Sequence, residues 1–151
     1  MPSLVAHCLW LALGSTHALI VPSIKLPSGD LMPQLGFGTW LAPAGQVYES
    51  IKVAIGLGYR HIDEAWIYGN ELEAGRAIAE MISSGTVKRE ELWITSKLWN
   101  NFHRPELVRP ACEESMAKLG LDYLDVRLHV HPIPLPLASR LARTLRKIII
   151  R

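Results

Sequence analysis

The chain of 151 residues has little cysteine and no apolar run that would span a bilayer comfortably. Its two cysteines, Cys8 and Cys112, are far apart, which excludes a disulfide framework and a CxxC redox or zinc motif. No other spacing of histidine, cysteine or acidic residues indicates a metal site, so we expect none. Gly36-Phe37-Gly38 is not followed by the GxGxxG run that joins a strand to a helix in dinucleotide-binding folds. What remains is a chain long enough for one globular domain with a core.

The main body of the chain also lacks an excess of positive charge. The net charge is +2, but residues 137–151 contain five basic residues and no acidic one. The residues before them contain eleven basic and fourteen acidic side chains. We therefore expect no nucleic-acid binding by the body and interpret the basic segment as a solvated face. An anchor for anionic membranes or nucleic acid is the alternative.

Both ends of the chain differ in composition from the middle. Residues 1–21 form an apolar N-terminal extension, in which Thr16-His17-Ala18 resembles a cleavage site although a basic first segment is lacking. A cleaved signal peptide, an uncleaved extension and an artefact of start-site choice all stay open, and we expect a cytoplasmic protein, with secretion as the alternative. Residues 133–151 are proline-rich and then basic. The folded domain is expected to occupy residues 22–132.

Segments typical of strands and helices alternate along this domain. The predicted strands, after a β-hairpin at residues 24–33, are the segments 35–40, 61–65, 92–97 and 123–128. The predicted helices are the segments 45–58, 70–83 and 105–119. Alternation with short connections indicates a parallel sheet covered by helices. Four β/α units are half of an eight-stranded barrel, and a whole barrel needs about 250 residues. We therefore expect an α/β fold: a TIM (β/α)8 barrel truncated to about its first four units.

Two helices are specified in more detail. Asn70 is expected to cap the second helix. The predicted apolar face of this second helix consists of Leu72, Gly75, Ile78, Ala79 and Ile82. The third helix begins at Pro105, a favoured residue for a first turn. Its predicted inward face consists of Val108, Ala111, Cys112, Ser115 and Leu119.

Three side chains with proton chemistry follow the predicted strands. Asp63 comes at the end of an apolar strand, and Tyr68 follows five residues later in the loop. Lys97 closes the next apolar strand. Loops after the strands of β/α folds carry the chemistry, and a carboxylate at the end of a buried strand is costly unless a cation pairs with it. We therefore expect Asp63, Tyr68 and Lys97 to form one site.

Residues 22–126 as a whole resemble the aldo-keto reductase family. The resemblance rests on the hairpin, on Leu35–Trp40, on Gly58–Glu71, on Ile94-Thr95-Ser96-Lys97-Leu98-Trp99 and on Leu119–Asp125, in that order along the chain. Members of that family are (β/α)8 barrels that reduce aldehydes and ketones with a nicotinamide cofactor, usually NADPH. The resemblance implies NADP(H) as the cofactor and a small carbonyl compound as the substrate.

The resemblance also implies a role for each site residue. Tyr68 matches the general acid that protonates the carbonyl oxygen, Lys97 the cation that makes the phenol a stronger acid, and Asp63 the charge partner of that cation. Thr39 and Asp63 match residues beside the nicotinamide ribose of the cofactor. Trp40 matches one wall of the substrate pocket.

Three positions depart from the pattern of the family. Glu64 replaces a small hydroxyl residue next to Asp63, which adds a charge in a tight place. Arg127 stands where an aromatic residue is usual, and Val130 stands where the family has histidine. His129 and His131 flank Val130, but alternation in a strand predicts that both point to the other face unless a bulge intervenes.

Two functions are compatible with these observations. The first is NADPH-dependent reduction of aldehydes or ketones to alcohols. The alternative is a catalytically inactive half-barrel with at most a binding role, because the later strands, with the basic phosphate clamp of the family, are not recognisable in the chain. Open sheet edges would then favour self-association.

Overall fold

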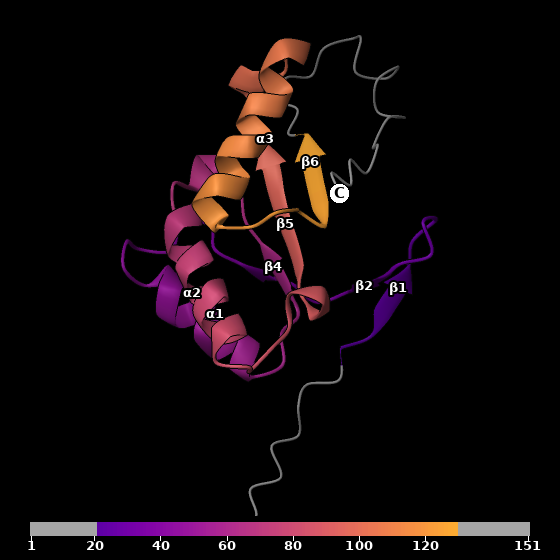
Figure 1. The fold of residues 1–151 in the computed structure, drawn as a ribbon, viewed down its shortest axis with the longest axis vertical. Helices are drawn as coiled ribbons and strands as arrows, with labels where there is room; N and C mark the ends of the chain where they lie inside the picture. The colour runs from indigo at the N-terminus through magenta and orange to yellow at the C-terminus, as the bar shows by residue number, and fades with distance from the viewer. Residues whose placement is uncertain (1–20, 130–151) are drawn as a thin grey trace, which may run out of the picture.

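The computed structural model describes residues 21–129 and contains two β-sheets (Figure 1). A small antiparallel hairpin joins β1 (Ser23–Lys25) to β2 (Leu31–Pro33), as the sequence predicts. The second sheet has four parallel strands, in the order β3 (Phe37–Gly38), β4 (His61–Asp63), β5 (Trp93–Leu98) and β6 (Val126–His129). Residues 1–20 of the expected extension, Val130, His131 and the tail at residues 133–151 lie outside the described residues.

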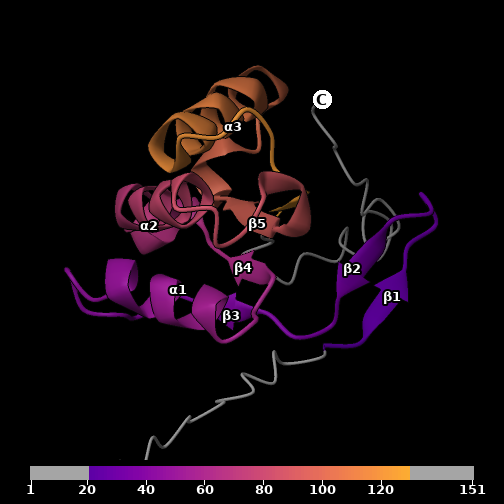
Figure 2. The same cartoon turned by 60° about the horizontal axis from the view of Figure 1, so that its bottom comes forward.

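The α-helices of the described residues lie in a row against one face of the parallel sheet (Figure 2). They are α1 (Val47–Gly56), α2 (Glu71–Ser83) and α3 (Pro105–Leu119). Three short 3-10 helices connect elements: η1 (Trp66–Tyr68), η2 (Arg89–Glu91) and η3 (Asn100–Phe102). The parallel strands and their helical cover confirm the predicted α/β class.

The core lies between the sheet and the helices. Side chains alternate along a strand, so Ile62 of β4 and Ile94 of β5 both point toward the helices. They pack in one buried cluster with apolar side chains of all three helices, among them Ile51, Ile55, Ile78, Cys112 and Leu119. The opposite face of the same strands carries His61, Asp63, Thr95 and Lys97.

The inward face of α2 differs from the predicted one. Leu72 is 63% exposed and Ala79 is also exposed, whereas Glu71, Ala74, Gly75, Ala77, Ile78 and Met81 are buried. The prediction was wrong at Leu72 because an acidic residue, Glu71, takes the inward position at the start of the helix. Asn70 precedes α2 but makes no side-chain cap; its amide Nδ2 donates instead to the Thr39 carbonyl at 3.1 Å.

The inward face of α3 agrees with the sequence at four of the five predicted positions. Ala111, Cys112, Ser115 and Leu119 are buried, and Val108 is partly buried. A side chain on Gly75 of α2 would place its Cβ 2.6 Å from the Leu119 carbonyl oxygen. Glycine at this position therefore lets α2 and α3 approach closely.

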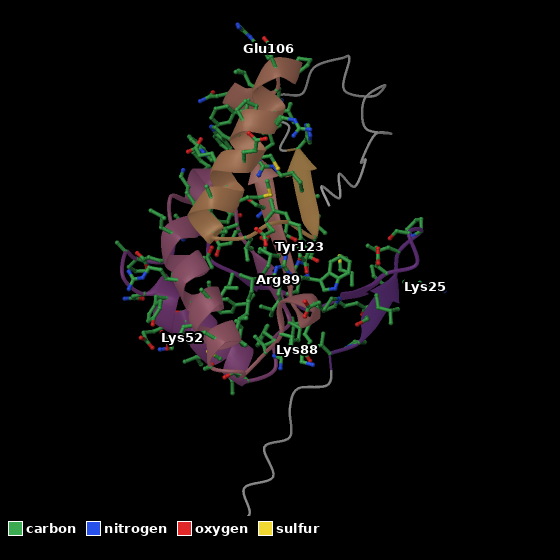
Figure 3. All side chains as sticks on the ribbon, viewed as in Figure 1. Lys25, Lys52, Lys88, Arg89, Glu106 and Tyr123 are labelled. Carbon is green, nitrogen blue, oxygen red and sulfur yellow. The ribbon has the colours of Figure 1, made fainter. Side chains whose placement is uncertain are left out.

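Arg89, which lies just before β5 in the chain, contacts two residues of the segment that precedes β6. Arg89, labelled with Tyr123 in Figure 3, lies 3.9 Å from the centre of the Tyr123 ring. Its Nη2 also donates to Asp125 Oδ2 at 2.8 Å, and the Ile94 amide donates to the same oxygen at 2.9 Å. Tyr123 and Asp125, which the sequence assigned to a strand, precede β6, which begins at Val126.

Candidate active site

Lys97 brings the three predicted catalytic residues together. Its Nζ lies 2.7 Å from Asp63 Oδ1, 2.8 Å from the Tyr68 hydroxyl and 3.1 Å from the Glu64 carbonyl oxygen. The Lys97 side chain is only 17% exposed, whereas that of Asp63 is 37% exposed. A charged lysine that is mostly buried needs such partners, since each one offsets part of the lost hydration.

The local fold explains why these residues meet. Asp63 and Lys97 belong to adjacent parallel strands and point to the face opposite the helices. The amide of Glu64 donates to the Thr95 carbonyl at 2.8 Å, which continues the pairing beyond β4. The chain then turns through η1, and Gly69, with φ of 70°, ends that turn so that Tyr68 faces Lys97.

Trp40 and Thr39 lie next to this trio in different surroundings. The Trp40 ring is 4.8 Å from the Tyr68 ring, tilted by 45°, and is 55% exposed. Thr39 is only 2% exposed, and its hydroxyl has no hydrogen-bond partner among the described residues.

Glu64 is buried on the helix side, directly behind the trio. Its exposed fraction is 0%, and burial raises the pKa of its carboxyl to about 8. The Thr39 hydroxyl lowers this pKa, and the charges of Glu71 and Asp63 raise it further. The sequence predicts a charge in a tight place here, but not that the proton would be retained at neutral pH.

The sequence did not predict that Glu64 belongs to a row of buried polar side chains on the helix side of the sheet, which we call the buried row. Its members are Glu64, Glu71, Ser96 and Arg127. Ser96 of β5 pairs in register with Arg127 of β6, and both are buried on the helix side. The Ser96 hydroxyl donates to Glu71 Oε1 at 2.8 Å. The positive charge of Arg127 is close enough to Glu71 to interact with it, while burial lowers the pKa of the guanidinium. Alternation from Asp63 and Lys97 could have placed Glu64 and Ser96 on the opposite face, but nothing in the sequence showed that Glu71 lies above them.

The two histidines of the described part that are near this region have other partners. His61 lies on the same face as Lys97, and its Nε2 is 2.9 Å from Thr95 Oγ1. The His129 ring lies 5.8 Å from that of His103. His129 is paired in register with Leu98, whereas Leu128 is paired with Lys97, so His129 points to the face opposite Lys97, as alternation predicts.

Within residues 21–129, no group of three or more histidine, cysteine or acidic side chains is arranged to hold a metal ion. No helix in the same range is long and apolar enough to cross a membrane. The described site itself places a phenol, an ammonium and a carboxylate in contact. Such a trio favours proton transfer by the phenol, because the ammonium stabilises the phenolate that is left.

Comparison with known proteins gives the same assignment for most of the chain. The model of the "Aldo/keto reductase family" matches residues 34–145. Human aldo-keto reductase family 1 member C3 is 48% identical over 124 residues, which are 80% of this chain and 38% of the human protein. An aldo/keto reductase of Synechocystis is 51% identical over 108 residues, which are 72% of this chain and 33% of that protein. The chain thus spans between a third and two fifths of the length of these relatives.

Solved structures show the same fold. The crystal structure of a Bombyx mori aldo-keto reductase in complex with NADP superposes with a TM-score of 0.73 at 43% identity, over 77% of this chain and 40% of that chain. The aldose reductase of Schistosoma japonicum superposes with a TM-score of 0.71 at 48% identity, over 75% of this chain and 38% of that chain. The described sheet and helices therefore correspond to the N-terminal part of a (β/α)8 barrel, as the sequence predicts.

Proposed function

The chain belongs to the aldo/keto reductase family, and on that premise we propose that it carries the proton-transfer centre of an NADP(H)-dependent carbonyl reductase. The observation that supports the proposal best is the contact of Lys97 Nζ with both the Tyr68 hydroxyl and Asp63. The substrate class is a small aldehyde or ketone, which is reduced to an alcohol.

Each residue has a separate task in this proposal. Tyr68 donates its hydroxyl proton to the carbonyl oxygen of the substrate. Lys97 stabilises the phenolate that forms, and Asp63 holds the ammonium in place. Trp40 limits the substrate pocket beside the phenol.

The described residues also fit one end of the cofactor. The ion pair uses Asp63 Oδ1, and the rest of this partly exposed carboxylate is available to a ribose hydroxyl. Gly38, the register partner of Asp63 on β3, has no side chain and leaves the space beside this carboxylate open. A Cβ at Gly38 would lie 4.0 Å from Asp63 Oδ2. Thr39 is the second residue proposed to lie beside the ribose. A bound nicotinamide would supply the hydride for the reduction.

A second function follows from the share of the barrel that is described. Residues 21–129 contribute four parallel strands, and the phosphate site of such barrels is commonly built after strands seven and eight. The 151-residue polypeptide by itself is therefore proposed to be inactive, with a binding role or self-association through its sheet edges. A cytoplasmic location is part of the same proposal.

A chimera separates the two functions. Residues 22–126 of this chain would replace the matching part of human aldo-keto reductase family 1 member C3, and NADPH oxidation would be followed with a reactive aromatic aldehyde. We expect the chimera to be active and its Tyr68→Phe variant to lose about 10²- to 10⁴-fold in kcat, with cofactor binding retained. Near-normal turnover by the Tyr68→Phe chimera would contradict the role of Tyr68. Aldehyde reduction by the 151-residue chain alone would contradict the second function.

A further inference from the structure

The loop of residues 39–45, which follows β3, is held at both ends by the start of α2. Asn70 Nδ2 donates to the carbonyl of the first loop residue, Thr39, at 3.1 Å. The amide of the last loop residue, Gly45, donates to Glu73 Oε1 at 2.9 Å. Asn70 and Glu73 therefore fix both ends of the loop to one helix.

The bond made by Asn70 is the buried one of the two. Asn70 is 9% exposed, whereas the bond between Gly45 and Glu73 is exposed to solvent. The Asn70 side chain makes no cap on α2, and its Oδ1 has no hydrogen-bond partner within residues 21–129. A hydrogen bond away from water is electrostatically stronger than one in water. The side chain of Asn70 thus serves the loop rather than the helix.

Two exposed apolar side chains lie between these contacts. Trp40 is 55% exposed and Leu41 is 78% exposed. Leu41 has φ of 60°, a left-handed conformation that is unfavourable for leucine and persists only where its surroundings hold it. The Ala42 amide closes this turn by donating to the Thr39 carbonyl at 3.2 Å. The same carbonyl accepts the bond from Asn70, so we expect loss of that bond to loosen the turn.

Asn70 also stands close behind the turn that carries Tyr68. Only Gly69 separates the two residues, and the Trp40 ring lies 4.8 Å from the Tyr68 ring. One side chain thus joins the loop that carries the indole to the turn that carries the phenol. We propose that Asn70 is a positioning residue whose bond to the loop fixes the Trp40 ring beside that of Tyr68. The consequence for substrates rests on the proposed function, because Trp40 is a pocket wall only if the site reduces carbonyl compounds.

The position of Trp40 can be followed without any catalysis. The full chain of 151 residues, which contains five tryptophans, would be labelled with 5-fluorotryptophan and studied by fluorine NMR. The Trp40 signal is identified by its loss in Trp40→Phe. Asn70→Leu removes the donor with little change of shape, so the Trp40 signal should shift toward that of free fluorotryptophan. The signals of Trp66, Trp93 and Trp99 should stay in place, whereas general unfolding would move them as well.

A second variant measures the contact with Tyr68 directly. Tyr68→Leu removes the aromatic ring next to Trp40, so in the parent chain it should shift the Trp40 signal. In the Asn70→Leu background the same change should shift the Trp40 signal by a much smaller amount, because the rings have already separated. Leu72→Ala, at an exposed position in the same turn of α2, is the matched control and should leave the Trp40 signal unchanged.

Two results would overturn the proposal: a Trp40 signal that is unchanged in Asn70→Leu, and shifts of similar size for all tryptophan signals. If Asn70→Leu does not fold, Asn70→Ser takes its place with the same expected shift. Serine is favoured before a helix but is too short to reach the Thr39 carbonyl.

The consequence for catalysis is tested in the chimera. Asn70→Leu should raise KM for the aromatic aldehyde about 3- to 10-fold and change kcat by less than about 3-fold, because the contact between Lys97 and Tyr68 is untouched. A fall in kcat with KM unchanged would contradict a role in placing the pocket wall. The NMR result does not depend on whether the Tyr68→Phe chimera loses activity, so the two proposals fail separately.

Discussion

Asp63 and Glu64 are consecutive acidic residues at the end of β4, and their side chains point to opposite faces of the parallel sheet. Asp63 is partly exposed and forms an ion pair with Lys97 at 2.7 Å. Glu64 is fully buried, makes no hydrogen bond through its carboxyl within the described residues and has a pKa raised to about 8 by burial. The same functional group, a carboxyl, thus forms an ion pair at Asp63, whereas at Glu64 it is expected to keep its proton at neutral pH.

The difference between the two acids comes from their neighbours. On the open face, Lys97 supplies one ammonium to Asp63 and Tyr68. On the helix side, Glu64 and Glu71 are buried, and within residues 21–129 the one buried cation is Arg127. Two acids and one base in a low-dielectric space are balanced when one acid stays neutral. Proton transfer is the function we propose for the open face, and on the buried face we expect the carboxyl of Glu64 to keep its proton at neutral pH.

The largest expected effect comes from removing the cation of the open face. In the chimera described above, Lys97→Met should reduce kcat by about 10²- to 10⁴-fold, because the phenolate formed by Tyr68 loses its stabilising charge. In the 151-residue chain the same change should cost about 1–3 kcal/mol of unfolding free energy, since Asp63 loses its partner. Urea unfolding measures this cost.

The matched control for this change is the double variant Asp63→Asn/Lys97→Met. It should recover part of the stability, because no unpaired carboxylate is left, but none of the activity. Equal stability of the single and double variants would show that the ion pair contributes nothing measurable to the fold.

The second expected effect concerns the buried acid and depends on pH. Because the pKa of Glu64 rises from 4.5 in the unfolded chain to about 8 in the folded one, its contribution is full below about pH 4.5 and is lost as pH rises to 8. Glu64→Gln does not titrate, so it should gain stability relative to the parent as pH rises. The gain should approach about 5 kcal/mol above pH 8, at about 1.4 kcal/mol for each unit of pKa shift. Denaturant melts at pH 5, 7 and 9 test this, and a difference independent of pH would contradict it.

A smaller effect on stability is expected at the contact between α2 and α3, where Gly75 lies against the backbone of Leu119. Gly75→Ala would place a methyl group 2.6 Å from the Leu119 carbonyl oxygen. The helices would have to separate, at a cost of about 1–3 kcal/mol. Ala74→Gly, at the neighbouring position, is the control for helix propensity alone and should cost about 1 kcal/mol or somewhat more because Ala74 is buried. Thermal unfolding that shows Gly75→Ala to be neutral would mean that the contact of the two helices is looser.

The smallest effect is expected at Leu72, which lies next to Glu71 but points to solvent. With 63% of it exposed, Leu72→Gln should change the unfolding free energy by less than about 0.5 kcal/mol. Leu119→Ala, in the core of the same helix pair, should cost about 2–5 kcal/mol. A large loss in Leu72→Gln would restore the helix face that the sequence predicts.

The sequence was sufficient for the fold and for the open face of the site. Apolar periodicity and short connections predicted the parallel strands and helices, and the ends of β4 and β5 predicted that Asp63 would meet Lys97. The buried face could not be predicted in the same way. Periodicity treats an acidic residue as solvent-facing, so it assigned Leu72 rather than Glu71 to the core. The burial of Glu71 and Arg127 depends on contacts between elements that are far apart in the sequence, such as Ser96 with Glu71.

The protonation of Glu64 at neutral pH is the claim on which this account of the two faces rests. Infrared difference spectra of the 151-residue chain at pH 7 would compare the parent with Glu64→Gln and, separately, with Asp63→Asn. We expect the Glu64→Gln difference to show the loss of a protonated carboxylic acid band, and the Asp63→Asn difference to show the loss of a carboxylate band. The acid band should disappear from the parent spectrum as pH rises through about 8. Loss of a carboxylate band in both variants at pH 7 would contradict the account.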